Sequence, residues 1–394
     1  MLWSMRLLRT ALRPRAITAI AVGGMLGVAS CVSLKPPSGS GSVPVVSGRY
    51  RNGRDQIVRL ALATAAREGP EMGSGRGPLV IRPESNSAFV VWNAKRYRGE
   101  LVITATDSGL LVVNRLPMDD YLRGVVPLEI GNRTAAEFAA VQAQAIAART
   151  YAYKHLNDAR PFDMYATVQD QVYGGVDAEK PQADSAIVTT RDIVVLYAGQ
   201  PISTPYSSTC GGSTAAVSEV WYTQPDEPYL RPVSDRIPGS DHFYCDPSPR
   251  FSWTQSFDGN GLRAIMEKYL AAYTSAPKTG VGRITDIREL GKTPSGRVAA
   301  LEVRTDSGTY RLRGKDIRFV LRDPKGAILN STYFSFTKDQ SGGEISSLNV
   351  NGRGYGHGIG MCQWGAIGRA RAGQNYRTIL ETYYQGTTIG RIAR

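Results

Sequence analysis

The sequence lacks the short motifs that most directly assign a chemistry. It has no Gly-x-x-x-x-Gly-Lys phosphate loop, no Gly-x-Ser-x-Gly nucleophile elbow and no His-Glu-x-x-His zinc motif. Gly354, Gly356 and Gly360 do not open a helix inside a strand–helix–strand unit, so they are not a dinucleotide fingerprint. No aromatic–basic RNA motif, zinc-finger spacing or internal repeat is present. These absences argue against nucleotide-dependent enzymes, α/β-hydrolases, zinc proteases and nucleic-acid-binding modules.

Cysteine is scarce, with four residues in the chain. In an oxidising compartment, Cys210 and Cys245 are expected to form a disulfide. The alternative is a metal site, zinc in particular, formed by Cys210, His242 and Cys245, because His242 and Cys245 have a short His-x-x-Cys spacing. Cys362 is then left as an unpaired thiol. The sequence requires no cofactor for its function.

No apolar run is long enough to span a bilayer stably. The longest N-terminal run, residues 16–30, follows four arginines and is typical of a secretory signal peptide. It ends in Val28-Ala29-Ser30-Cys31, which resembles a bacterial lipobox. Cleavage there makes Cys31 a lipidated N-terminus anchored in the membrane. Val32, in place of Asp, favours the periplasmic face of the outer membrane.

Acidic residues are outnumbered by basic ones, and the formal net charge is +13 over 394 residues. Removal of the four signal-peptide arginines, with no acid, lowers it to +9. An exported basic protein meets cell-wall polymers and lipid headgroups, whereas export makes nucleic acid an unsuitable partner. With 42% hydrophobic and 21% charged residues, the chain is expected to be globular, with two or three packed units.

Composition and spacing predict six segments. They are a lipoprotein signal peptide (1–30), a flexible tether (31–49), an N-terminal β-rich segment (50–116), a core in two parts (117–250 and 346–394) and an inserted α/β subdomain (251–345). Between residues 56 and 115, apolar runs about ten residues apart predict antiparallel strands. Thr134 and Glu137 form a capping box before a helix with one apolar stripe. We therefore expect an α+β fold, with an antiparallel-strand-rich core, a packed Ala-rich helix and a smaller β-rich insertion.

Glycine occupies every second position from Gly352 to Gly360. In a strand, alternate residues point to opposite faces, so this stretch predicts a strand through Ile359 with one bare face and one polar face. A bare face allows close approach of another backbone or a ligand.

Glu129 is a lone carboxylate in an apolar segment, just before the predicted helix. Apolar surroundings raise a carboxyl pKa and keep its proton available near neutral pH, which is what a general acid needs. The alternatives are a solvent-facing loop residue or one aimed at a helix N-terminus. A nucleophilic Ser208–His357 pair lacks an evident Asp to complete a triad.

Four blocks resemble the SpoIID/LytB family of stage II sporulation protein D-like proteins and amidase enhancers. The blocks are DYLRGVVPLE (120–129), AQAIAARTYA (143–152), YSSTCGGST (206–214) and GYGHGIGMCQWGA (354–366), and they occur in the family's order. The resemblance covers roughly residues 117–386. It implies a peptidoglycan lytic transglycosylase, a lyase in which Glu129 is the single general acid and base. It also makes the two-part core the catalytic unit.

The resemblance implies a polar and aromatic glycan groove. Its candidate substrate-binding residues are Arg149, Tyr151, Gln171, Tyr173, Tyr206, Ser208, Tyr355, His357 and Gln363. The chain departs from the family at Ser207, where many members carry His near a zinc site, and at Cys362, where Ser is common. The proximity of Cys362 to His357 in sequence leaves a different ligand set open. The lipobox replaces the usual membrane helix, so a spore role does not carry over.

Two non-catalytic alternatives remain. The protein is then a peptidoglycan-binding enhancer of a separate cell-wall amidase, or a structural cell-wall-binding lipoprotein. Glu129 separates them from the enzyme, because a pure binder needs no protonated carboxyl group in an apolar segment.

Overall fold

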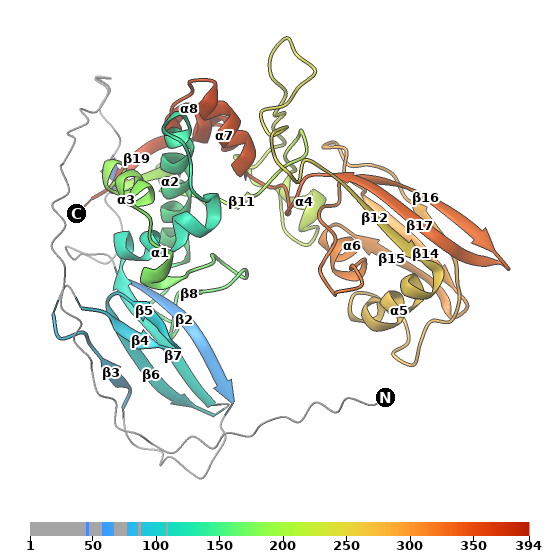
Figure 1. Cartoon of the computed structure of the whole chain (residues 1–394), viewed down its shortest axis with the longest axis horizontal. Helices are drawn as coiled ribbons and strands as arrows, with labels where there is room; N and C mark the ends of the chain where they lie inside the picture. Colours follow the sequence, from blue (N-terminus) through green and yellow to red (C-terminus); the bar gives the residue numbers. More distant parts are fainter. Residues whose placement is uncertain (1–44, 47–56, 67–76, 86–87, 108, 394) are drawn as a thin grey trace.

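A computed structural model describes residues 45–46, 57–66, 77–85, 88–107 and 109–393, and these form a mixed α+β fold of two lobes (Figure 1). The expected fold class is therefore confirmed. The predicted signal peptide and Cys31 lie outside the described residues, as does the tether apart from Val45–Val46, which form a short strand. Among the described residues, no helix combines the length and apolar character that a membrane crossing needs.

The first lobe contains a five-stranded sheet in the order β3-β6-β7-β2-β8. Its strands are β2 (Ile57–Ala66), β3 (Leu79–Ile81), β6 (Glu100–Thr106), β7 (Gly109–Pro117) and β8 (Met164–Tyr165). All neighbours pair antiparallel except β2 and β8. A separate hairpin joins β4 (Val90–Trp92) to β5 (Lys95–Tyr97). The antiparallel strands predicted from the spaced apolar runs are confirmed.

Helices pack beside this sheet and share one hydrophobic core with it (Figure 1). They are α1 (Met118–Ile130), α2 (Phe138–His155), α3 (Pro181–Thr189), α7 (Gln363–Arg371) and α8 (Tyr376–Tyr383). The predicted capping box is confirmed, with the Thr134 N–H donating to Glu137 Oε2 at 2.7 Å. The prediction of a single apolar stripe on α2 is wrong. Most of this helix is buried, because α1, α3, α7, α8 and a strand pack around it.

The strand packed on α2 belongs to a second, smaller sheet of the first lobe, in the order β1-β19-β9-β10. Its members are β1 (Val45–Val46), β9 (Ile193–Tyr197), β10 (Gln200–Pro201) and β19 (Thr388–Ile392). Through β19, the end of the described chain joins the core of the first lobe, and Ile389 and Ile392 are buried there.

The second lobe has its own hydrophobic core, formed by residues from Phe257 to Val350. One of its sheets has the order β12-β17-β16, and the other has the order β13-β14-β15. The bounds are β12 (Ser252–Asp258), β13 (Ile284–Glu289), β14 (Ala300–Thr305), β15 (Gly308–Arg313), β16 (Phe334–Ser341), β17 (Glu344–Arg353), α5 (Gly259–Tyr269) and α6 (Lys315–Val320). Because β17 pairs with β12 and buries Leu348 and Val350, this lobe extends past the predicted boundary at residue 345.

The alternating glycines are not a continuous strand, which corrects the sequence prediction. β17 ends at Arg353, and the four glycines at 354, 356, 358 and 360 all have positive φ. Gly360, at φ +70°, lies so close to the Pro205 carbonyl that an added Cβ would be 2.1 Å from its oxygen. This close approach leads into the parallel pairing of β11 (Tyr206–Ser207) with β18 (Met361–Cys362). The glycines therefore let two backbones meet closely in the first lobe.

Candidate active site

The Glu129 side chain lies where the distant sequence blocks converge. Glu129 is in the last turn of α1 and is half-buried. Its Oε1 accepts a hydrogen bond from the Val172 N–H at 3.2 Å, and its backbone carbonyl accepts one from Gln363 Nε2 at 3.0 Å. The side chains of Gln363 and Tyr206 also reach its carboxyl group. Three segments that follow α1 in sequence thus surround one carboxyl group.

A chain of hydrogen bonds orients Tyr206 toward Glu129. The Tyr121 hydroxyl donates to Gln171 Oε1 at 2.5 Å, which fixes the orientation of that amide. Gln171 Nε2 then donates to the Tyr206 hydroxyl oxygen at 2.9 Å. The Tyr206 hydroxyl, having accepted this bond, is free to donate its own proton toward Glu129. Tyr121 and Gln171 are buried, so this chain is well shielded from water.

The environment of Glu129 raises the pKa of its carboxyl group above the usual value. Burial is the main cause, because it disfavours the charged form. Hydrogen bonds from the Val172 N–H and from the Gln363 and Tyr206 side chains act in the opposite direction. Burial therefore favours the protonated carboxyl group, and the donors stabilise the carboxylate once that proton leaves.

Arg149 does not line this site, which corrects its assignment as a substrate-binding residue. Its side chain is 1% exposed. Its guanidinium donates to the carbonyls of Thr190, Ile193 and Ile187 at 2.8 to 3.3 Å. Asp119 lies 3.5 Å away as its ion-pair partner. Arg149 therefore ties α2 to α3 and β9, because a buried guanidinium needs this many acceptors.

Two more of the predicted groove residues make structural contacts. Tyr173 is buried, donates to Asn114 Oδ1 at 3.0 Å and packs against the rings of Tyr97 and Tyr121. His357 Nε2 lies 2.9 Å from the Tyr206 carbonyl oxygen, and its Nδ1 accepts from the Ile359 N–H at 3.0 Å. Both ring nitrogens are thus engaged by the backbone, which fixes the tautomer with the proton on Nε2.

The neutral form of His357 is also favoured electrostatically. Burial, with the nearby Arg318 and Arg297 charges, lowers the pKa of His357 to about 4. Ser208 Oγ lies 3.3 Å from Thr209 Oγ1. His357 Nε2 faces the Tyr206 carbonyl, so the structure does not pair Ser208 with it as a nucleophile and base. His357 instead fixes the backbone that carries Tyr206.

Tyr355 and Tyr151, two more of the predicted groove residues, each make side-chain contacts of their own. Tyr355 lines a cavity of about 280 Å³ in the second lobe, where the Arg250 guanidinium stacks 4.2 Å from its ring centroid. Tyr151 is half-buried, stacks on His155 and donates to Asp170 Oδ1 at 2.9 Å. A larger cavity of about 660 Å³ is lined by Trp253, among others, and also belongs to the second lobe.

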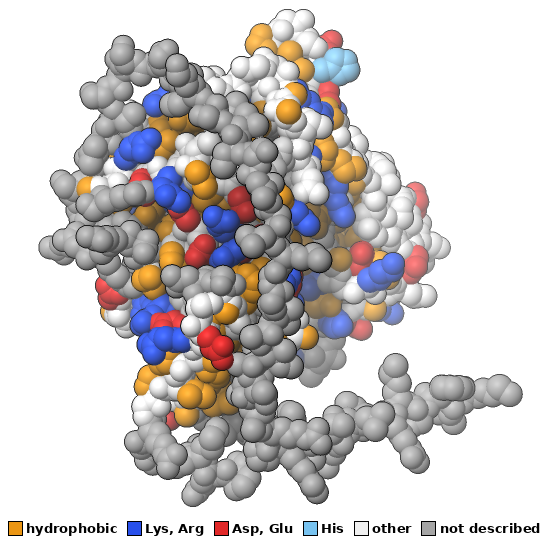
Figure 2. Space-filling model, turned by 60° about the vertical axis from the view of Figure 1, so that its left-hand side comes forward, with side chains coloured by type: hydrophobic (Ala, Val, Ile, Leu, Met, Phe, Trp, Pro, Cys, Tyr) orange, Lys and Arg blue, Asp and Glu red, His pale blue; other side chains and the backbone are white. Residues whose placement is uncertain are grey.

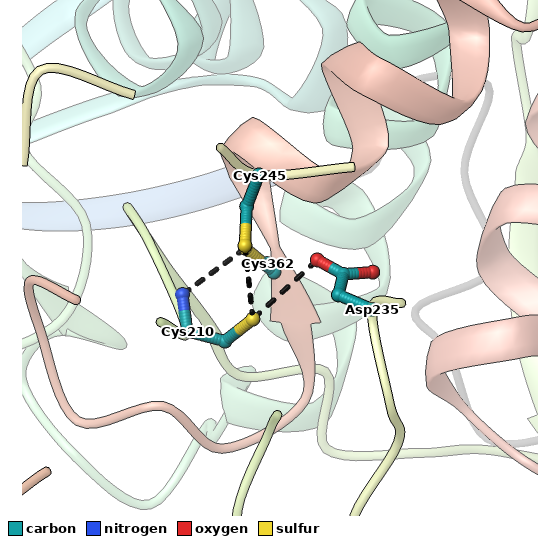
Figure 3. A group of neighbouring side chains, drawn as sticks. All are labelled: Cys210, Asp235, Cys245 and Cys362. Carbon is teal, nitrogen blue, oxygen red and sulfur yellow. Dashed lines mark hydrogen bonds between the residues drawn. The ribbon is translucent and has the colours of Figure 1, made fainter. Parts of the chain in front are cut away.

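The cysteines gather in one place, but His242 does not join them. Cys210, Cys245 and Cys362 are buried together with Asp235, and their ligand atoms all lie within 4.8 Å of one another (Figure 3). His242 has an 80% exposed side chain and pairs with Asp246 at 3.0 Å. The predicted metal-ligand set of Cys210, His242 and Cys245 is therefore wrong for His242. Cys362, predicted as the unpaired thiol, lies beside the other two.

The sequence did not reveal several residues of the site, because their partners lie far away along the chain. Tyr121 and Gln144 lie inside the recognised blocks, and Gln144 Oε1 accepts from Gln363 Nε2 at 3.2 Å. The Val172 N–H has no sequence signal, because any residue but proline supplies one. Asp235 lies in an irregular stretch far from the other blocks. The polar residues within alanine-rich α2 were the one usable signal, since buried polar groups require partners.

The face shown in Figure 2 intersperses basic, acidic and apolar side chains. On that face, basic side chains therefore lie beside acidic ones. Such a surface does not single out one polyanion-binding patch there.

Comparison with known proteins finds two family models and several relatives that match parts of the chain. A family model described as Stage II sporulation protein matches residues 106–197, and a domain of unknown function (DUF8618) matches residues 239–360. An uncharacterized protein of Brachyspira hyodysenteriae is 33% identical over 309 residues, covering 78% of this chain and 75% of the relative.

Two relatives from Bacillus subtilis carry functional names. The amidase enhancer is 32% identical over 295 residues, which cover 68% of this chain but only 40% of that protein. Stage II sporulation protein D is 28% identical over 294 residues, covering 70% of this chain and 75% of that protein. The chain therefore belongs to the family of stage II sporulation protein D, as its four sequence blocks indicated.

Proposed function

We propose that this protein is a peptidoglycan lytic transglycosylase in which Glu129 is the single general acid and base. The observation that supports this most directly is the half-buried Glu129 carboxyl group, with a raised pKa, at the meeting point of the family blocks. Membership of the family and the name of the amidase enhancer relative support a role at the cell wall. The substrate is then the bond between N-acetylmuramic acid and N-acetylglucosamine.

The proposed reaction needs only one carboxyl group. Most glycosidases need two, one to protonate the leaving oxygen and one to activate water or attack the sugar. Here Glu129 gives its proton to the glycosidic oxygen as the bond to the muramoyl C1 breaks. The muramoyl 6-hydroxyl attacks C1 and returns its proton to the Glu129 carboxylate. The product is a 1,6-anhydromuramoyl end, the carboxyl group is regenerated, and no water is consumed.

The groups around Glu129 suit both halves of this cycle. In the first half, burial favours the protonated acid that this step needs. In the second half, donors from Val172, Tyr206 and Gln363 stabilise the carboxylate until it recovers a proton. Glu129 and Tyr206 are only half-buried, so a glycan can approach them from solvent. Gln171 positions Tyr206 from behind and is itself too buried to face the glycan.

The decisive experiment is mass spectrometry of purified glycan strands incubated with the full chain in detergent, beside Glu129→Gln. Anhydromuramoyl ends from the wild type alone are expected. Cleavage by both proteins would move the acid to another residue, and cleavage by neither would remove the enzyme proposal. A Glu137→Gln control changes another carboxylate, one engaged in the capping box just before α2, and should leave the anhydromuramoyl product intact.

A second candidate function is favoured by one relative. The amidase enhancer is 32% identical, and its name describes stimulation of a separate enzyme. If neither the wild type nor Glu129→Gln cleaves glycan but both bind it and accelerate a purified cell-wall amidase, this function applies. A structural cell-wall-binding lipoprotein would bind without either effect.

The proposed location follows from the N-terminal sequence. Export by the signal peptide and lipidation of Cys31 would anchor the chain at the cell envelope, on the periplasmic face of the outer membrane. Cys31→Ser should abolish incorporation of labelled fatty acid and release the chain from membrane fractions. Retention in the membrane after that change would contradict the lipid anchor.

A further inference from the structure

Three thiols and a carboxylate share one buried pocket in the first lobe. The Cys210 and Cys245 Sγ atoms are 3.6 Å apart, and Cys210 Sγ lies 3.4 Å from Asp235 Oδ2. Cys362 Sγ completes the group, and the four ligand atoms all lie within 4.8 Å of one another. Figure 3 shows the four side chains converging from separate segments.

These separations suit a tetrahedral ion. With Zn–S bonds of about 2.3 Å and a Zn–O bond of about 2.0 Å, the edges of the tetrahedron are roughly 3.8 Å between sulfurs and 3.5 Å between sulfur and oxygen. The observed 3.6 Å and 3.4 Å are close to those edges. Three sulfurs and one oxygen around one point are the ligand types that zinc prefers.

Two backbone N–H groups point at the Cys362 sulfur, an arrangement that suits a metal-bound thiolate. Cys362 Sγ accepts from the Cys210 N–H at 3.1 Å and from the Gly365 N–H at 3.3 Å. Cys362 also caps the N-terminus of the nine-residue helix α7, where the helix dipole stabilises negative charge.

The second layer of contacts orients Asp235 toward the cysteines. Asp235 Oδ1 accepts from the Tyr383 hydroxyl at 2.6 Å and from Arg369 Nη2 at 3.1 Å. Its Oδ2 is thereby directed at Cys210. Such a hydrogen-bonded outer shell is typical of metal-binding carboxylates. Arg369 and Arg297 are both buried nearby, and Arg297 Nη2 donates to the Cys210 carbonyl at 3.1 Å.

Charge also balances with a divalent ion. Three thiolates and one carboxylate carry four negative charges, and the guanidiniums of Arg297 and Arg369 offset two of them. A zinc ion neutralises the remaining two. Because the metal binds thiolates, its binding would release the thiol protons.

We propose that Cys210, Asp235, Cys245 and Cys362 bind a structural zinc ion. Four protein ligands leave no open position for a substrate, so the ion holds the fold rather than reacting. It joins the segment that follows Tyr206 to the one that precedes Gln363, and both of these side chains reach Glu129. Zinc binding itself is independent of whether Glu129 is catalytic.

The test measures metal and thiols in the full chain purified in detergent without chelator. Elemental analysis should give about one zinc ion per chain. Alkylation after unfolding, without reductant, should modify Cys210, Cys245 and Cys362. Cys245→Ser and Cys362→Ser should lose the zinc, whereas the matched control His242→Ala should retain it, because His242 lies outside the cluster.

Spectroscopy on the unaltered chain removes the risk that a cysteine variant fails to fold. Wild-type protein exchanged with cobalt(II) should show thiolate-to-cobalt charge transfer and the strong visible bands of a tetrahedral site. A Cys210–Cys245 disulfide, seen as resistance of both residues to alkylation until reduction, would overturn the proposal. Three free thiols with no bound zinc and no cobalt spectrum would overturn it as well.

Discussion

At the scale of single residues, Glu129 shows how one environment can serve two protonation states. Burial favours the neutral acid, and three hydrogen-bond donors favour the carboxylate. The balance between them sets the pKa, so changes to the donors should be visible in pH dependence before they are visible in structure.

The pH dependence of the free energy of unfolding should show that ionisation of Glu129 destabilises the fold. Because its pKa is raised in the fold, the stabilisation that its neutral form provides is full below the usual glutamate pKa of about 4.3 and is lost as pH rises through the folded-state value. Glu129→Gln stays neutral at every pH. We therefore expect it to be more stable than the wild type at neutral pH and equally stable in acid. Urea unfolding across pH checks this, and a less stable variant at neutral pH would contradict the raised pKa.

Tyr206→Phe should change the pH profile as well as the rate. The variant loses a hydroxyl that favours the Glu129 carboxylate, so the pKa of Glu129 should rise further. The basic limb of the activity profile should move to higher pH, with a rate loss of about tenfold. Tyr384→Phe is the matched control, since that buried hydroxyl donates to the Pro205 carbonyl instead. An equal shift in both variants would indicate a general loss of packing.

The same scale shows what the sequence can and cannot predict. Glu129 was identifiable, because an acid in an apolar segment is unusual whatever surrounds it. Arg149 and Tyr173 were assigned to a groove by their position in the blocks, yet both are buried by neighbours from other segments. Partners such as Thr190 and Asn114 are far away in sequence, so no local pattern reports them. For the same reason, the sequence predicted Cys210 and Cys245 as members of one cluster but not Asp235, whose spacing in the sequence does not distinguish it.

At the scale of elements, local periodicity predicted strands and the capped helix but not their surroundings. The strands before α1 follow from apolar runs, and their antiparallel pairing follows from short connections. The helix α2 was expected to have one buried side, but it occupies the centre of the lobe, which its alanines permit. The glycine alternation matched strand periodicity while the backbone adopted positive φ at every second residue. The spacing of the glycines alone does not distinguish an extended strand from a backbone with positive φ at every second residue.

The glycine segment makes a prediction at this scale. Gly360→Ala places a Cβ 2.1 Å from the Pro205 oxygen at φ +70°, whereas Gly373→Ala meets nothing within 4 Å at φ +82°. Backbone strain alone should cost the Gly373 variant about 1 to 2 kcal/mol. The Gly360 variant should lose roughly 3 kcal/mol or more, because the clash adds to the strain. Denaturant unfolding compares the two, and equal losses would show that the close approach is unimportant.

Displacement at Gly360 should also reach the candidate active site. Met361 pairs with Tyr206 across β18 and β11, so a shift of one strand moves the hydroxyl beside Glu129. We expect Gly360→Ala to lose glycan cleavage under conditions where it is still folded. The Gly373 variant should keep that activity, because its position follows α7 and is open to solvent.

At the scale of the whole molecule, two hydrophobic cores are joined by a buried arginine. Arg297 belongs to the second lobe, and its guanidinium donates to the Ser213 and Cys210 carbonyls of the first at 3.1 Å each. It also packs against Gly358, where a Cβ would come within 2.1 Å of its Nη2 atom. The side chain is 1% exposed, so water does not replace these bonds. The second lobe thus supports the backbone that carries Cys210.

Replacing Arg297, a residue of the second lobe, should therefore also destabilise the first lobe. Arg297→Ala leaves two buried carbonyls without donors and opens a cavity, for an expected cost of about 3 kcal/mol. Arg304→Ala is the matched control in the same lobe, because Arg304 is 43% exposed and pairs with Glu302. It should change stability by no more than about 0.5 kcal/mol. If calorimetry found that Arg297→Ala lowered only the unfolding transition of the second lobe, the lobes would be independent. Lowering of both transitions, together with reduced glycan cleavage, is the expected result, since the Cys210 segment leads directly from Tyr206.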